Sequence, residues 1–277
     1  MKLQYLGTAA AEAVPAPFCL CPVCQDARRK GGRNIRTRSQ ALVDDRLLLD
    51  LPADTYLHTL RDGLKLYDID TLLVTHCHSD HLYPAELECL YSWAAHRPGP
   101  RTFHLYGAAP VLARVRAETP GFADMDREGR LQLHQITAFA PFEAEGFQIT
   151  PLRADHGAED SLVYLLEKGG RAMLYAHDTG FLPPETLDYL RAHPVALDLV
   201  SYDCTNGLLN PGRENHMGLA VNCELRQTLA DMGLTGAQTL HVVNHFSHNG
   251  KAGYDEMADA AGKQGFLTSY DGMVVEF

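Results

Sequence analysis

The chain of 277 residues contains no apolar run long enough to span a bilayer, so the sequence excludes a membrane-spanning helix. Basic residues are scarce, because 24 lysines and arginines stand against 35 acidic residues, for a net charge of −11. Unspecific binding to nucleic acid depends on cationic side chains that neutralise phosphates, which makes a nucleic-acid partner unexpected. An anionic small-molecule substrate is still compatible with this negative net charge, because bound divalent cations can make one pocket locally positive.

Signals for export are missing as well. The first seven residues are typical of a strand rather than of a signal peptide, and the sequence contains no Asn-x-Ser/Thr sequon. The seven cysteines, an odd number that includes Cys19, Cys21 and Cys24, indicate reduced thiols around a metal rather than a disulfide framework. We therefore expect a cytoplasmic protein.

Apolar runs and helical periodicities alternate along the chain without a Pro/Ser linker, which predicts a single domain over residues 1–277. Residues 9–38 are expected to be irregular, with a Cys-rich insert at about 12–38 and a basic run from Arg28 to Arg38. The predicted strands are 1–7, 40–43, 46–50, 71–74, 102–106, 131–136, 147–152, 162–166, 172–175, 197–202 and 239–243. The predicted helices are 53–64, 83–96, one from residue 110, 184–192 and 219–232.

The most informative stretch, residues 75–81, follows the apolar strand at 71–74. It contains His76, His78, Asp80 and His81, and polar groups at a strand end are costly to bury unless they are paired, for which metal ions are well suited. If the turn is tight, His76 and His78 share one side while Asp80 and His81 reach the other, so one loop could hold two metals. The alternative is a cluster of surface histidines on a polar loop. A surface position would be the better interpretation for a single histidine, but not for this motif.

This His-x-His-x-Asp-His pattern after a strand resembles the signature of the metallo-β-lactamase superfamily, and the resemblance extends from end to end of the chain. It implies an α/β fold, the αβ/βα four-layer sandwich of two mixed β-sheets flanked by helices, with metals at one edge. His76 and His78 would bind one metal, and Asp80 and His81 the second. Asp80 therefore also belongs to the expected catalytic residues.

Three later residues occur at predicted strand ends in the order that the resemblance requires: His156, Asp178 and His245. Taken alone, His156 would be a hydrogen-bonded loop residue, and Asp178 an Asx turn or a helix cap. The resemblance implies that His156 completes the first metal's ligands, Asp178 bridges both metals and His245 completes the second set. Imidazole and carboxylate ligands accept manganese, zinc or iron, so the metals stay open.

The three cysteines of the insert supply three thiolates, and a closed tetrahedral zinc site needs a fourth ligand. Free thiols, buried or reactive, are the alternative. The phosphodiesterase branch of the superfamily from bacterial phosphonate utilisation has a similar Cys-x-Cys-x-x-Cys insert, in which the second histidine of a His-x-x-His pair is the fourth ligand. His245 and His248 match that pair, so the resemblance assigns His248 to a structural zinc with Cys19, Cys21 and Cys24.

His216 matches a histidine that binds no metal in the phosphodiesterases of this superfamily, including the tRNA 3′-processing nucleases. In that role it would contact the phosphoryl oxygen and protonate the leaving alkoxide. Asp203 is placed like the acidic residue that orients this histidine. A carboxylate held against an imidazole raises the pKa of the imidazole towards neutrality. A residue at the N-terminus of a helix is the alternative for His216.

Together these residues predict a dinuclear metal-dependent phosphodiesterase that cleaves a small, cyclic phosphodiester with a hydroxide shared between the metals. The expected partner is a small molecule rather than a membrane or nucleic acid, and the resemblance implies a homodimer. Two alternatives stay open: a hydrolase of lactones, thioesters or amides, and an accessory protein of quinone-cofactor biosynthesis without catalysis. Contact of Arg36 or Arg38 with substrate is a further hypothesis.

Overall fold

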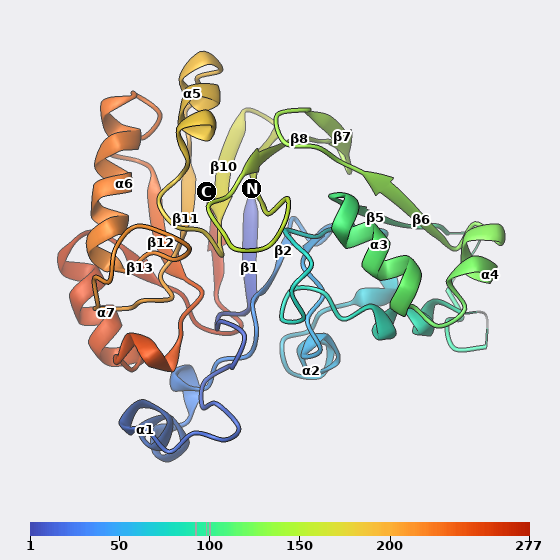
Figure 1. The fold of residues 1–277 in the computed structure, drawn as a ribbon, viewed down its shortest axis with the longest axis horizontal. Coiled ribbons are helices and arrows are strands. Elements are labelled where there is room, and N and C mark those ends of the chain that lie inside the picture. The colour runs from blue at the N-terminus through green and yellow to red at the C-terminus, as the bar shows by residue number, and fades with distance from the viewer. Residues whose placement is uncertain (92, 98, 100) are drawn as a thin grey trace.

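Two mixed seven-stranded sheets face each other in the computed structural model, which describes residues 1–91, 93–97, 99 and 101–277 (Figure 1). Across the first sheet the order is β14 (Val274–Glu276), β1 (Lys2–Gly7), β2 (Gln40–Val43), β3 (Leu47–Leu49), β4 (Thr71–Leu73), β5 (Phe103–Gly107) and β6 (Leu131–Gln135). Across the second it is β13 (Leu267–Thr268), β12 (Leu240–Asn244), β11 (Leu199–Asp203), β10 (Arg171–Ala176), β9 (Leu162–Lys168), β8 (Phe147–Arg153) and β7 (Phe142–Ala144).

Apolar side chains on the facing surfaces of the sheets form the central core. Tyr5 of β1 belongs to the same buried cluster as Tyr164 of β9 and Tyr175 of β10. Strand β3 is buried on both faces, since Leu47 and Leu49 join this central cluster while Leu48 joins a second cluster behind the first sheet. A strand covered on both sides needs the continuous leucine run that the sequence has there.

Helices cover the outer faces of the sheets. Leu112 of α3 (Ala109–Glu118), Met125 of α4 (Phe122–Arg127) and Leu87 of the 3₁₀ helix η3 (Pro84–Leu90) pack in the cluster behind the first sheet. Helices α5 (Pro184–Ala192), α6 (Leu219–Asp231) and α7 (Tyr254–Lys263) contribute Leu190, Leu225 and Met257 to the cluster behind the second. The expected four-layer αβ/βα sandwich is therefore confirmed. No helix in the described part of the chain has both the length and the apolarity to cross a membrane.

The insert is more regular than expected. Residues 22–30, predicted to be irregular, form helix α1 (Pro22–Lys30), which lies away from both sheets in Figure 1. Cys21 is its N-cap, with its sulfur accepting from the Cys24 N–H, and Pro22 takes the first helical position, where its missing N–H costs nothing. The 3₁₀ helix η1 (Gly32–Asn34) follows.

Other elements also differ from the prediction. The helix expected over 83–96 is only η3, a seven-residue 3₁₀ helix, and residue 92 of that range lies outside the described residues. Helix α2 (Thr55–Arg61) is shorter than the predicted 53–64, and the short helices η2 (Leu66–Asp68) and η4 (His248–Gly250) were not expected. Neither were α4, α7, β7, β13 and β14. The hairpin of β2 and β3 is confirmed.

Parallel pairing brings the ends of several strands to one place. Strands β10, β11 and β12 run parallel, so the segments after their carboxyl ends lie side by side. Asp203, the last residue of β11, pairs with Asn244 at the end of β12. The loop after β4 joins this edge from the first sheet, because the Leu162 N–H of β9 donates to the Thr75 carbonyl at 3.0 Å.

Candidate metal centre and active site

The loop after β4 is fixed by backbone hydrogen bonds. The Leu82 N–H donates to the His78 carbonyl at 2.9 Å, and the Leu51 N–H donates to the His81 carbonyl at 2.7 Å. His76 and His81 are buried, whereas His78 is exposed. The tight loop sends His76 and His78 to one group of potential ligands and Asp80 and His81 to another.

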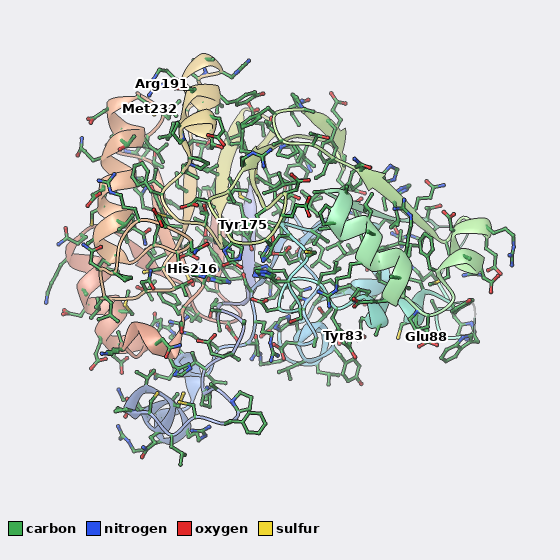
Figure 2. The ribbon with its side chains drawn as sticks, in the orientation of Figure 1. Tyr83, Glu88, Tyr175, Arg191, His216 and Met232 are labelled. Atoms are coloured by element: carbon green, nitrogen blue, oxygen red, sulfur yellow. The ribbon has the colours of Figure 1, made fainter. Side chains whose placement is uncertain are left out.

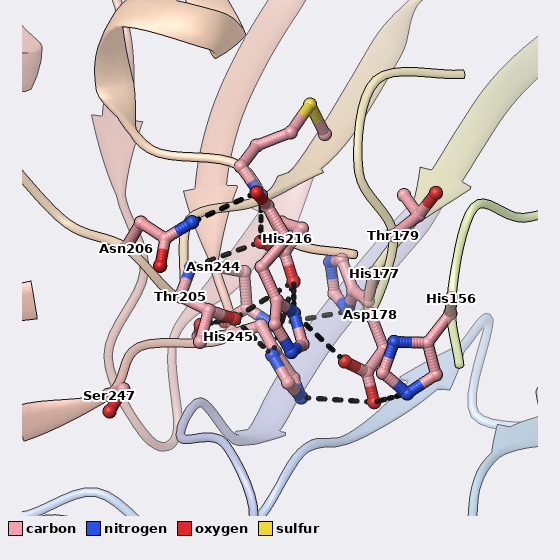
Figure 3. Close-up of polar contacts among 12 residues, drawn as sticks. His156, His177, Asp178, Thr179, Thr205, Asn206, His216, Asn244, His245 and Ser247 are labelled. Atoms are coloured by element: carbon pink, nitrogen blue, oxygen red, sulfur yellow. Dashed lines mark hydrogen bonds and ion pairs between the residues drawn. The ribbon is translucent and has the colours of Figure 1, made fainter. Parts of the chain in front are cut away.

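Each group contains four residues. In the first, His76, His78, His156 and Asp178 each offer one ligand atom within 4.8 Å of the others. The second group, Asp80, His81, Asp178 and His245, meets the same criterion and is entirely buried. Asp178 belongs to both: its Oδ2 lies 3.2 Å from His76 Nε2 and 3.0 Å from His81 Nε2. Figure 3 shows its carboxylate between His156 and His245.

The backbone is strained at two of these residues. Asp178 follows β10 with φ 52°, and His245 follows β12 with φ 61°. Residues that carry a β-carbon adopt this left-handed conformation at a cost of roughly 1 to 2 kcal/mol, and such strain recurs at functional sites. At Asp178 and His245 this conformation turns the chain sharply at the residue whose side chain belongs to the ligand groups.

The donor set fits divalent cations. His76 Nε2, His156 Nδ1 and Asp178 Oδ1 are buried and make no hydrogen bond of good geometry among the described residues, although His76 Nε2 and Asp178 Oδ1 each have an ion-pair neighbour at 3.2 Å. Buried polar atoms of this kind are rare and costly. Imidazole nitrogens shared with a bridging carboxylate suit zinc, manganese or iron, so the residues present could hold two such ions.

Metal binding needs neutral imidazoles and ionised carboxylates, and His76 and Asp178 already have these states. At His81 and His245 burial lowers the pKa, but neighbouring carboxylates outweigh it and raise the pKa, so a bound cation would displace a proton there. Burial, helped by the charge of His81, lowers the pKa of His76 to about 4. Burial raises the pKa of Asp178, but His245, His76 and His81 outweigh it and hold that pKa well below its ordinary value. Asp178 is therefore an anion at neutral pH.

Asp50 is a functional residue that the sequence prediction missed. Its carboxylate is fully buried, and its Oδ2 lies 2.7 Å from His81 Nδ1. Asp50 Oδ1 accepts from the Thr75 N–H at 2.8 Å, which ties it to the first residue of the motif. A carboxylate on the second ring nitrogen leaves Nε2 of His81 as the liganding atom.

His216 lies beside both groups, towards the middle of the molecule in Figure 2. Its Nδ1 is 3.3 Å from Asp203 Oδ2 and 3.2 Å from Asp178 Oδ1 (Figure 3). Burial lowers the pKa of His216, but the hydrogen bond to Asp203 and the charges of Asp203, Asp178 and Asp80 outweigh it and raise that pKa to about 9.

Asp203 is held rigidly. It is fully buried, and its Oδ1 accepts from the backbone N–H groups of Thr205 and Met217 at 3.1 and 2.9 Å. Burial raises the pKa of Asp203, but hydrogen bonds from His216 and His245 prevail and lower it to about 2. Its Oδ2 also lies 3.3 Å from His245 Nδ1, so one carboxylate faces both histidines.

A third group of potential ligands lies at the insert. One ligand atom from each of Cys19, Cys21, Cys24 and His248 falls within 4.8 Å of the others. His248 Nδ1 faces Cys19 Sγ at 3.5 Å and Cys21 Sγ at 3.4 Å. Three thiols and one imidazole form the donor set of a closed structural zinc site, so this group could hold one zinc.

The His/Asp groups open into a cavity of about 380 Å³. Its lining includes the potential ligands His78, Asp80, His156, Asp178 and His245, together with His216, Thr205, Asn206, Ala10, Ala11, Glu12, Ser247 and Asn249. The cavity therefore joins five potential ligands, His216 and the start of the insert in one space.

Comparison with known proteins supplies the family. A family model described as the beta-lactamase superfamily domain matches residues 48–243, more than half of the chain. The chain belongs to the metallo-β-lactamase superfamily. Within this superfamily, the ribonuclease Z of Listeria innocua serovar 6a is 25% identical over 179 residues, which are 64% of this chain and 52% of that protein. The chain thus spans about half the length of the curated relatives it matches.

Solved structures of low identity share the fold. A diphosphatase from the PhnP family has a TM-score of 0.72 at 21% identity, covering 100% of this chain and 96% of its own. Zinc-bound PqqB from Methylobacterium extorquens has a TM-score of 0.74 at 20% identity, covering 100% of both chains. The predicted likeness to this part of the superfamily is therefore confirmed for the fold.

Arg36 and Arg38, suggested as substrate contacts, both bind other residues of the protein. Arg36 is buried, donates to Thr8 Oγ1 and the Ser269 carbonyl, both at 2.8 Å, and stacks 4.1 Å from the Phe246 ring centroid. Arg38 pairs with Asp54 at 3.1 Å. Neither lines the cavity, and their contact with substrate stays a hypothesis.

Proposed function

We propose that this protein is a dinuclear metal-dependent hydrolase of small phosphodiesters. His76, His78, His156 and Asp178 would hold one divalent cation, and Asp80, His81, Asp178 and His245 the second. When bound, such a pair supplies a water of lowered pKa as nucleophile and neutralises charge on phosphoryl oxygens. The observation that carries the proposal is His216, paired with buried Asp203 at the wall of the same cavity.

His216 acts as the general acid. Asp203 holds its Nδ1, which leaves Nε2 free to give a proton to the departing alkoxide oxygen. A pKa raised to about 9 keeps the ring protonated at neutral pH, and nearby cations would bring that value down towards the working range. An alkoxide is a poor leaving group without a proton, which is why a phosphodiesterase needs such a residue.

The relatives agree with chemistry at phosphorus. One is named a ribonuclease and another a diphosphatase. The cavity of about 380 Å³ favours a compact substrate, such as a small cyclic phosphodiester, and the net charge of −11 argues against a long nucleic acid. Zinc is the expected metal of the thiolate site, and zinc or manganese that of the paired site.

The accessory role without catalysis that the sequence analysis left open is the competing function, and the fold of zinc-bound PqqB is as similar as that of the diphosphatase. The filled set of ligand positions and the adjacent His216 favour the enzyme. Hydrolysis of lactones or thioesters would need the same metals, but it explains the pairing of His216 with Asp203 less well than phosphodiester hydrolysis does.

The test compares His216→Ala with the wild type on cyclic phosphodiesters, whose alkoxide leaving group needs a proton, and on bis(p-nitrophenyl) phosphate, whose phenolate leaves without one, beside a lactone and thioester panel. We expect the rate on cyclic phosphodiesters to fall roughly 10²- to 10⁴-fold, with a smaller loss on bis(p-nitrophenyl) phosphate, while the metal content per chain is unchanged. His193→Ala is the matched control, since that histidine is exposed and bonds to its own helix at the Tyr189 carbonyl. A variant that loses metal yet keeps its rate per bound metal would contradict the role of His216.

A further inference from the structure

The imidazole of His248 has a second polar neighbour. Its Nδ1 faces the sulfurs of Cys19 and Cys21, and its Nε2 lies 3.6 Å from Glu12 Oε1. Glu12 has no part in the proposed reaction, although it lines the catalytic cavity. The ring therefore stands between a carboxylate and a pair of thiols.

The position of Glu12 is determined by its surroundings. Its carboxylate accepts a short hydrogen bond from the hydroxyl of Ser247, the residue before His248. The Ala10 N–H donates to the Phe246 carbonyl at 3.0 Å, and the Phe246 N–H donates to the Thr8 carbonyl at 2.9 Å. These bonds hold the start of the insert alongside the segment that carries His245 and His248.

We propose that Glu12 is a positioning residue for the thiolate metal site. Its carboxylate accepts the Nε2–H of His248, which selects the tautomer whose Nδ1 can bind zinc and orients the ring towards the sulfurs. A distance of 3.6 Å is that of an ion pair, slightly longer than a hydrogen bond. The proposal requires the Glu12 side chain, which is 30% exposed, to rotate slightly towards the ring.

Contact with substrate is a less favourable role for this side chain. A carboxylate at the rim of a cavity for an anionic phosphodiester repels the substrate. Contact with His248 gives this negative charge a favourable role. When His248 Nε2 donates to a carboxylate, Nδ1 becomes a more basic ligand and binds zinc more strongly.

The test is the zinc affinity of the thiolate site, measured without substrate by competition with a chromophoric chelator. We expect Glu12→Gln to weaken it 10- to 100-fold. Thiolate-to-cobalt absorption after cobalt substitution should shift in the same variant, and it reports only on this site because the His/Asp groups contain no sulfur. Glu143→Gln, at the exposed position of strand β7, is the matched control.

Glu12→Asp keeps the charge on a shorter side chain, so its zinc affinity should fall between the wild type and Glu12→Gln; it also serves if the glutamine variant does not fold. Wild-type zinc affinity in Glu12→Gln, with a changed KM, would overturn the proposal and make Glu12 a substrate contact. Because the readout is zinc binding, failure of the proposed function would leave this result untouched.

Discussion

Asp50 illustrates how a carboxylate outside the two His/Asp groups can orient a potential metal ligand. Because its carboxylate holds His81 Nδ1 at 2.7 Å, Asp50→Asn should weaken metal binding by the second His/Asp group 10- to 100-fold. Isothermal titration of metal-free protein with manganese measures this affinity. Asp198→Asn, at the opposite ends of β10 and β11, is the control and should bind as the wild type does. Equal affinity in Asp50→Asn would contradict the assigned role.

The potential metal ligands could be predicted from the sequence, whereas a residue that orients one of them, Asp50, could not. Four potential ligands share the short motif at 76–81, and His156, Asp178 and His245 stand at strand ends, where loops carry function. Asp50 closes a leucine run and looks like a strand residue. The available signal was its charge, because a carboxylate at the end of a buried strand needs a partner.

Among the elements, the Cys-rich insert is the one that we expect to need a zinc ion in order to fold. The segment 12–38 contributes few residues to the apolar clusters, with Phe18 and Leu20 exposed. Removing the thiolate zinc through Cys21→Ser should therefore make this segment the first site of limited proteolysis, because metal binding contributes to local folding. Cys223→Ser, on α6, is the control. Unchanged cleavage in Cys21→Ser would show that the segment is stable without zinc.

Elements set by local pattern were predicted, and those set by distant partners were not. Strand β14 has three residues and exists because it pairs with β1 at the other end of the chain. Helix α1 was missed because the cysteines and the basic run obscure its apolar positions, of which Cys24 and Ala27 are buried. Tertiary contacts decide such short elements, and a single sequence does not report them.

At the scale of the whole molecule, buried His58 should make the free energy of unfolding depend on pH. Burial, helped by the charge of Arg61, lowers its pKa to about 4 from an ordinary 6.5. Its ring bonds to Thr37 Oγ1 at 2.8 Å and Gln40 Oε1 at 2.6 Å. The unfolded chain therefore takes up the proton first as the pH falls. This contribution, about 3 kcal/mol, is complete above pH 6.5 and is lost between pH 6.5 and pH 4.

Urea unfolding of metal-free protein between about pH 7.5 and about pH 4.5 measures this dependence. His58→Gln should be less stable at the higher pH and lose less stability on acidification than the wild type, whereas exposed His193→Gln should keep the wild-type slope. Equal slopes for wild type and His58→Gln would refute the contribution of His58.

The proposed chemistry depends on two cations that the strand ends of both sheets hold around Asp178. The decisive measurement is the metal content per chain, obtained by elemental analysis after reconstitution with manganese and zinc. We expect two equivalents in the wild type beyond the zinc of the thiolate site, and Asp178→Ala should lose both, together with phosphodiester hydrolysis, while keeping the thiolate zinc. A wild-type protein that binds only one zinc, released by Cys21→Ser and unaffected by Asp178→Ala, would contradict it.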